Sequence, residues 1–199
     1  KLPASTDAKI TSGVYTVSGG SGPSETITKV PFGTAKATFL GNLAQSEASS
    51  TWDSSGIANP VVSGDIVTST AQDGTTKIAY VVTVNADPGI QAVAADKAAL
   101  TDTVVQNANP NLSNVTTNLS LITVGTASSS NIFWTSDNPT YVATSGVISR
   151  PLFSVGDVTV HVTSTISSST ASDTKAFTVI VLKLPASTDA KITSGVYTV

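Results

Sequence analysis

One long segment occurs twice in this chain, letter for letter. KLPASTDAKITSGVYTV fills Lys1–Val17 and recurs without a change at Lys183–Val199. Identity over so long a stretch does not arise by chance, so it indicates a tandem repeat in which Lys183 takes the place of Lys1. We therefore expect one complete repeat over residues 1–182, followed by the first strand of the next repeat over residues 183–199.

The composition favours strands over helices. Serine, threonine and valine are abundant and only 12% of the residues are charged, a mixture that suits a pleated, half-buried surface. The net charge of −3 lacks the basic footprint of a nucleic-acid-binding or anionic-membrane-binding protein. The chain has no cysteine, which excludes disulfides, zinc fingers and thiol catalysis and fits an exposed surface protein. No apolar run approaches the roughly 18 residues of a membrane span, so any anchor is expected in another part of the protein.

Turn signals divide the chain into short strands and one helix. Asp73-Gly74 predicts a hairpin turn, and Pro88 in the stretch Asn85–Ile90 interrupts the strand pattern. Apolar residues at helical spacing predict a helix over 89–105. Strands are expected at Lys9–Val17, Thr26–Val30, Ala35–Leu40, Asp65–Ala71, Lys77–Val84, Leu119–Val124, Asn131–Thr135, Thr140–Ser149, Asp157–Thr165 and Asp173–Leu182.

This pattern predicts an all-β chain of two tandem β-sandwich domains, with one short helix at the start of the second. The first domain is expected over residues 1–87 and the second over residues 88–182. Residues 183–199 would then begin a further copy of the first domain.

The second half resembles bacterial immunoglobulin-like domains of large secreted and surface proteins. The matching pieces are the strand Ile132–Trp134 with the turn Ser136–Pro139, the stretch Gly146–Pro151, and the strands Asp157–Thr165 and Ala176–Val181. The first half resembles the related cadherin-like sandwich, through STDAKI near its start and TAQDGTTKIAYVVTV at its end. The resemblance implies an immunoglobulin-like fold and a structural or adhesive module, with no catalytic residues, so we do not expect an enzyme.

Few residues point to a cofactor or a ligand. His161 is the only histidine and nothing around it has the pattern of a nucleophile elbow. No cofactor is expected; Asn85 and Asp87 are candidate calcium ligands, although Asp and Asn also favour turns for local reasons. Trp134 is expected in a core, whereas Trp52 is a candidate platform for a surface glycan, although a tryptophan in such a place is more often structural. Three glycosylation sequons, which so Ser/Thr-rich a chain also acquires by chance, lie at Asn111, Asn114 and Asn118.

The predicted function is mechanical. We expect a structural repeat of an extracellular, cell-surface fibre, stalk or surface layer (S-layer) whose partners are copies of itself, joined head to tail. The alternatives are an adhesin and a carbohydrate-binding accessory module of a secreted protein. Assembly would proceed by covalent continuation into the next repeat or by donation of the second copy as a strand to another chain. The residues expected to pair are Ile192, Val196, Tyr197 and Val199.

Overall fold

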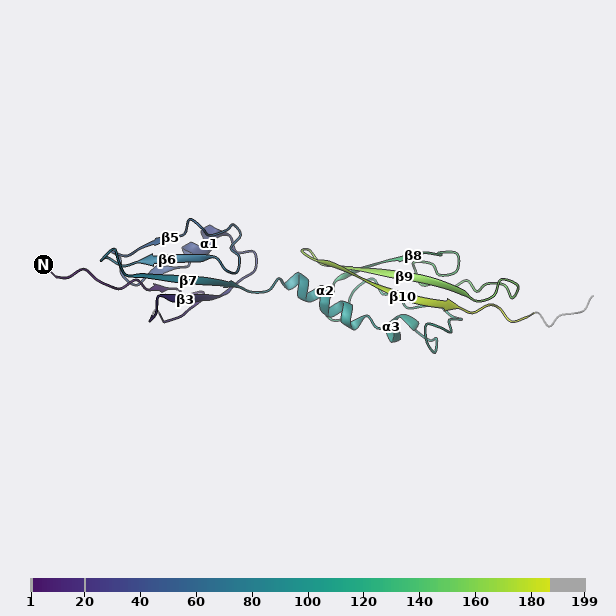
Figure 1. Ribbon diagram of the computed structural model, residues 1–199. Coiled ribbons are helices and arrows are strands. Elements are labelled where there is room, and N and C mark those ends of the chain that lie inside the picture. Colours follow the sequence, from purple (N-terminus) through teal and green to yellow (C-terminus); the bar gives the residue numbers. More distant parts are fainter. Residues whose placement is uncertain (1, 20, 187–199) are drawn as a thin grey trace, which may run out of the picture. The chain divides into compact units, whose positions relative to one another are not determined.

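The computed structural model describes residues 2–19 and 21–186 (Figure 1). The chain divides into two compact units, Lys1–Pro88 and Gly89–Val199, called unit 1 and unit 2 below. Strands outnumber helices among the described residues, so the chain is mostly β, as its composition predicts. No helix in the described part of the chain has both the length and the apolar character needed to cross a bilayer.

Unit 1 contains a five-stranded mixed sheet. Its central strand β7 alternates buried Ile78, Tyr80 and Val82 with more exposed residues, the pattern of a strand with one face on a core. The strand β7 runs parallel to β3 and antiparallel to β6. The sheet order is β2 (Thr16–Val17), β3 (Ser24–Val30), β7 (Lys77–Val84), β6 (Ile66–Thr70) and β5 (Thr51–Asp53).

The turn between β6 and β7 forms at Asp73-Gly74, where the sequence predicts it. Gly74 has φ +74°, a conformation that L side chains rarely adopt. The Asp73 carboxylate accepts the N–H groups of Thr75 and Thr76 at 2.9 and 2.8 Å, and it also accepts the two hydroxyls. The hydrogen bonds from Thr76 and Thr75 lower the pKa of Asp73 to about 2, so this turn keeps its charge through the whole physiological range.

Two expectations for unit 1 are wrong. The segment predicted as the strand Ala35–Leu40 is the helix α1 (Lys36–Gly41), because Phe39 must point into the core, where it is fully buried, and the Asn59 side chain caps the N–H of Lys36. The segment Lys9–Val17 is not one strand. It forms β1 (Ile10–Thr11), which pairs with β4 (Ala44–Gln45), and then β2 in the large sheet.

Unit 2 packs helices against one face of a three-stranded antiparallel sheet. The sheet order is β10 (Ser172–Val181), β9 (Val158–Ser167) and β8 (Asn131–Ser136). Helices α2 (Pro88–Ala99) and α3 (Asp102–Gln106) lie along it (Figure 1). They contribute Val93 and Val105 to the core, and Leu100 between them is also part of it. The single predicted helix over 89–105 is therefore interrupted after Ala99. With α1 in unit 1, the expectation of one helix is wrong.

Two segments of unit 2 predicted as strands are irregular. Leu119–Val124 and Thr140–Ser149 each make a single β-bridge, Val124 with Asn131 and Val142 with Ile148. Local turns replace the ladder in the second segment: the Asn138 carbonyl accepts the N–H groups of Tyr141 and Val142. The third isolated bridge, Val115 with Val181, ties an irregular segment to the end of β10.

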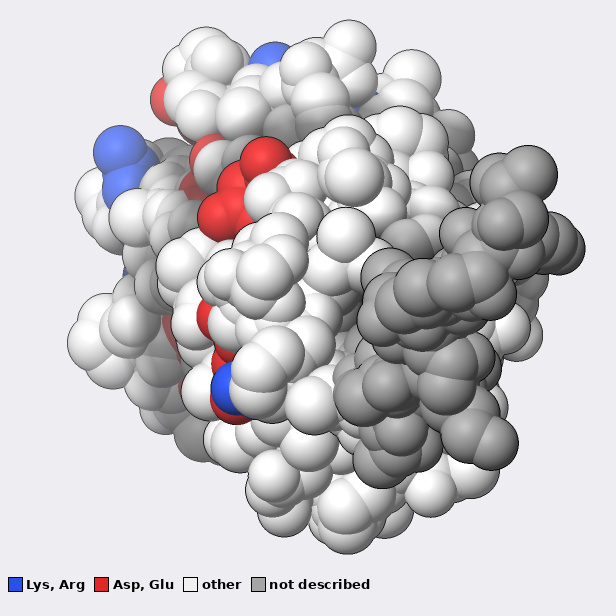
Figure 2. All heavy atoms as spheres, turned by 90° about the vertical axis from the view of Figure 1, so that its right-hand side faces the viewer, with Lys and Arg blue, Asp and Glu red and all other residues white. Residues whose placement is uncertain are grey.

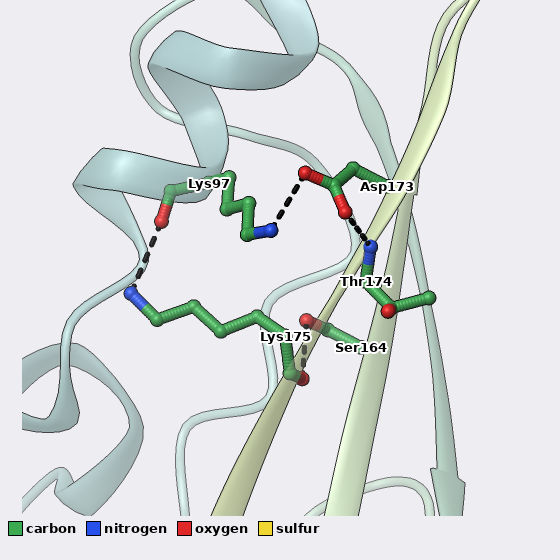
Figure 3. A network of polar contacts seen from close by, with 5 residues as sticks. All are labelled: Lys97, Ser164, Asp173, Thr174 and Lys175. Atoms are coloured by element: carbon green, nitrogen blue, oxygen red, sulfur yellow. Dashed lines mark hydrogen bonds and ion pairs between the residues drawn. The ribbon is translucent and has the colours of Figure 1, made fainter.

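Polar side chains attach α2 to β10. Lys97 Nζ lies 2.6 Å from an Asp173 carboxylate oxygen, and Lys175 Nζ donates to the Lys97 carbonyl at 3.1 Å (Figure 3). On the sheet side, the Ser164 hydroxyl donates to the Lys175 carbonyl at 3.1 Å. Both partners of the ion pair are substantially exposed, so the pair orients the helix and adds little stability.

A buried carboxylate fixes the other side of α2. Asp96 is 1% exposed and accepts the N–H groups of Ala127, Ser128 and Ser130 at 2.8 to 2.9 Å. Burial alone would raise the pKa of Asp96, but these hydrogen bonds outweigh it and hold the pKa below its usual value. A Cβ on Gly125 would lie 2.1 Å from the Asp96 carboxyl carbon, so only glycine fits there.

Candidate assembly site

The first copy of the repeated segment is part of the core of unit 1. We call its described residues, 2–17, the leading segment. Ala8, Ile10 and Tyr15 are 1%, 3% and 6% exposed and belong to the same cluster as the sheet residues. The Tyr15 ring lies 5.4 Å from the Phe39 ring, between centroids. Unit 1 is therefore incomplete without this segment.

Hydrogen bonds fix the leading segment in register. The Ile10 N–H donates to the buried Tyr80 hydroxyl at 3.0 Å, and the Ser46 N–H donates to the Lys9 carbonyl at 2.9 Å. Between β1 and β2 the Ser12 hydroxyl accepts the N–H groups of Val14 and Tyr15 and donates to the Asn42 carbonyl. This turn explains why one alternating sequence serves two sheets: it redirects the chain between two short strands.

Earlier in the segment, the chain is attached to the β6–β7 turn. The Ser5 N–H donates to the Gln72 side chain at 3.0 Å, and the Asp73 N–H donates to the Ser5 carbonyl at 3.1 Å. Before Ser5 the segment leaves the surface, and Leu2 is 91% exposed. Ser5 is therefore the point at which the repeated segment becomes attached to unit 1.

The second copy begins just after β10, the last strand of unit 2. We call Arg150–Asp157 the exit loop, because it holds the chain as it leaves β10. Arg150 donates from Nε to the Leu182 carbonyl at 2.9 Å and from Nη2 to the Lys183 carbonyl. The Lys183 N–H donates to the Asp157 carboxylate at 2.9 Å, and the Leu184 N–H donates to the Pro151 carbonyl at 2.8 Å.

The predicted pairing residues lie outside the described residues, but their identical counterparts do not. Ile192, Val196, Tyr197 and Val199 correspond to Ile10, Val14, Tyr15 and Val17. Ile10 and Tyr15 are buried and Val17 is partly buried, whereas Val14 is 60% exposed. We call the place that the first copy occupies in unit 1 its slot. In this slot the isoleucine and the tyrosine pack against the core, whereas the first valine faces solvent.

The candidate calcium ligands lie at the end of unit 1. Asn85 is exposed and donates its N–H to the Val30 carbonyl at 2.8 Å, while Asp87 is buried. Within the described ranges, no three His, Cys, Asp or Glu side chains form a group that could hold a metal. Calcium at Asn85 and Asp87 stays a prediction.

His161 has a structural partner. Its Nδ1 lies 2.8 Å from the Asp137 carboxylate, which also accepts the His161 backbone N–H at 2.9 Å, and both side chains are more than half exposed. The side-chain and backbone hydrogen bonds from His161 lower the pKa of Asp137. The pair holds the turn after β8 against β9.

The two tryptophans differ as expected only in part. Trp134 is 3% exposed, donates from its indole N–H to the Ile122 carbonyl at 2.8 Å and packs against Phe177, so it belongs to the core of unit 2. Trp52 is half-buried and packs against the core of unit 1, which leaves it less of a platform than the sequence suggested. The sequon residues Asn111, Asn114 and Asn118 are all exposed.

Two features of unit 2 were not predicted. Asp96 lies on the buried face of α2, three residues after Val93 and four before the buried Leu100, and an acid at such spacing among apolar residues was the signal. The contact of Arg150 with Leu182 and Lys183 joins segments far apart in the chain, for which the sequence holds no signal.

Comparison with known proteins bears on unit 2. No curated protein matches the chain. Residues 93–184 match the family model of the atrophied bacterial Ig domain, whose relatives of the Ig-like class are typically not catalytic. The cadherin-like resemblance of the first half stays a prediction. The match confirms the predicted similarity of the second half of the chain to a bacterial Ig-like domain.

Proposed function

We propose that this chain is a structural repeat of an extracellular surface protein, in which copies of residues 1–182 follow one another covalently as a fibre, stalk or surface layer. The observation that carries this proposal is that the recurring segment includes core residues of unit 1, among them Ile10 and Tyr15. The apolar side chains of such a segment can be buried as they are in unit 1 only if the remaining strands of a unit 1 are also present. Its second copy follows β10 in the chain and is hydrogen-bonded to the exit loop.

The family match supports the surface location. Bacterial Ig-like domains are surface-protein modules and are often extracellular. Modules joined in series give an object whose length scales with copy number. Covalent continuation also requires no free strand, whereas strand donation leaves a β-rich segment exposed until a partner arrives.

The test has a genetic and a cellular part. The complete reading frame is expected to contain further copies at the spacing that separates Lys1 from Lys183. An antibody against unit 1 is expected to label intact cells in amounts that fall after external protease treatment. A reading frame in which residue 199 is followed by sequence unrelated to Ser18 onward, or labelling only after lysis, would contradict the proposal. Binding of the purified chain to a glycan array in place of self-association would favour the adhesin or carbohydrate-binding alternative.

A further inference from the structure

The exit loop of unit 2 exposes apolar side chains beside the start of the second copy. Leu152, Phe153 and Val155 are 63%, 52% and 54% exposed, and Leu184 next to them is 39% exposed. The Lys183 ammonium lies 4.4 Å from the centre of the Phe153 ring. Large apolar residues gathered in one loop mark an interaction surface.

Two identical leucines show what this loop does. Leu2 and Leu184 occupy the same position in the two copies. Leu2 is 91% exposed and Leu184, held by its N–H on Pro151, is 39% exposed. The exit loop therefore contacts the first residues of the second copy and holds the chain where it leaves β10.

The next attachment point follows within three residues. Ser5, the first residue of the leading segment bonded to the β6–β7 turn, corresponds to Ser187. From Leu184 to Ser187 the chain reaches at most about 11 Å, since an extended residue spans about 3.6 Å, and Pro185 restricts it further. If a unit 1 follows, its β6–β7 turn must lie close to the exit loop.

Unit 1 has an open depression at this place, beside the leading segment. The depression combines the buried apolar side chains of Ala8 and Ile78 with the charged side chains of Asp7, Lys9 and Lys77. Ser5–Lys9 of the leading segment form part of its lining, so in a following unit the depression would begin at the counterpart of Ser5, Ser187. Figure 2 views the molecule from the side at which β10 terminates; most of the visible spheres belong to uncharged residues, and acidic and basic side chains are also present.

We propose that the exit loop docks into this depression on unit 1 of the following repeat and makes the joint between repeats rigid. The occupant is thus a second copy of unit 1, supplied by the continuing chain. The inference rests on the proposed function and adds to it. An array with docked joints is stiff and keeps its direction from one repeat to the next, whereas an array with free joints has the same contour length but bends at every joint.

The test uses a two-repeat protein, made by following Val199 with residues 18–182 of the same sequence. The chain has no cysteine, so Ser169→Cys in the first repeat and Ser49→Cys in the second, both at exposed positions, take two spin labels. Double electron–electron resonance then measures the distance distribution across the joint. We expect one narrow distribution for the parent protein.

The matched variants place Leu152→Ser and Phe153→Ser either in the first repeat or in the second. In the first repeat the loop faces the joint, and the distribution is expected to broaden several-fold. In the second repeat no unit follows the same loop, so the distribution is expected to stay narrow, which also controls for the effect of the substitutions on unit 2 itself.

A broad distribution in the parent, or no broadening in the first-repeat variant, would overturn the docked joint. Concentration-dependent association that these substitutions abolish would also overturn it, because the loop would then serve lateral contacts. None of these results would remove the tandem array, which fails only if the reading frame or the cellular labelling contradicts it.

Discussion

A chain that lacks residues 1–17 is expected to associate end to end. Its unit 1 has lost Ala8, Ile10 and Tyr15 from the core, together with β1 and β2. Burial of a large apolar side chain contributes about 1.5–3 kcal/mol, so Ile10 and Tyr15 together account for about 3–6 kcal/mol, which reaches the lower end of the stability of a small domain, about 5–15 kcal/mol. The same segment remains at positions 183–199 and can fill the slot of a neighbouring chain.

The expected result is concentration-dependent growth of mass in sedimentation velocity, with unit 1 unfolded at high dilution. Because each chain would donate at one end and accept at the other, the contact is heterologous and gives chains or rings of variable length. Added peptide KLPASTDAKITSGVYTV is expected to return the protein to folded monomers. The full chain, whose own first copy fills the slot, is the reference.

Two substitutions separate the specific mechanism from general stickiness. Ile192→Asp places a charge at the counterpart of Ile10, which is 3% exposed, and is expected to abolish association. Val196→Asp introduces the same charge at the counterpart of Val14, which is 60% exposed, and is expected to leave association intact. A truncated chain that stays folded and monomeric would show that the segment is dispensable to unit 1. Equal effects of the two variants would show that association does not depend on the packing seen for Ile10.

Replacement of Asp96 is expected to have the largest effect of any single substitution in unit 2. Asp96→Ala leaves three N–H donors without the carboxylate that accepts them, the buried one of Ser130 and the part-buried ones of Ala127 and Ser128, and an unsatisfied buried donor costs about 1–3 kcal/mol. Solvent entry will offset part of this, so we expect a loss of roughly 3–5 kcal/mol, the upper end for point substitutions. Gly125→Ala is expected to act in the same direction, because its Cβ would displace the carboxylate.

Urea denaturation followed by Trp134 fluorescence measures this loss, with Trp52 replaced by phenylalanine so that only unit 2 reports. The control is Asp102→Ala, an exposed acid in the first turn of α3, for which about 0.3–1 kcal/mol is expected. If the two substitutions cost the same, the buried carboxylate does not organise the unit.

The same carboxylate gives unit 2 a dependence on pH with a definite sign. The folded pKa of Asp96 is lowered, so its contribution to stability is present above the ordinary pKa of about 3.9 and is lost as the pH falls through the folded pKa. In Asp96→Asn this acid-dependent part of the loss is expected to be absent, which a series of urea midpoints between neutral and acid pH would show.

The sequence predicts a segment's secondary structure well where its apolar residues recur with a regular period. The strands β7 and β9 alternate over eight and ten residues, and both were predicted nearly to the residue. The segment that became α1 is six residues long, too short for helical and strand spacing to be told apart. The irregular stretches of unit 2 depend on single polar hubs such as Asn109, which bonds four backbone groups within residues 106–117, and such hubs leave no periodic pattern.

For the assembly site, the repeat in the sequence identified the segment, and the structure showed which of its side chains are buried. Identity of the two copies predicted that Ile192 and Tyr197 share a role with Ile10 and Tyr15. The prediction also counted Val196 among the pairing residues, because it treated the whole segment as one continuous alternating strand. The turn at Ser12 changes which side chains face inward, and only the structure shows it.

The most direct test of the central claim is the reactivity of a single thiol in the two-repeat protein. If residues 183–199 begin a further unit 1, the Ile192→Cys thiol is buried like Ile10, and the Val196→Cys thiol is exposed like Val14. Labelling by a maleimide reagent is expected to be slower by roughly 100-fold or more at position 192 than at position 196, as for a site that opens only by local unfolding. Equal rates at the two positions would contradict the account.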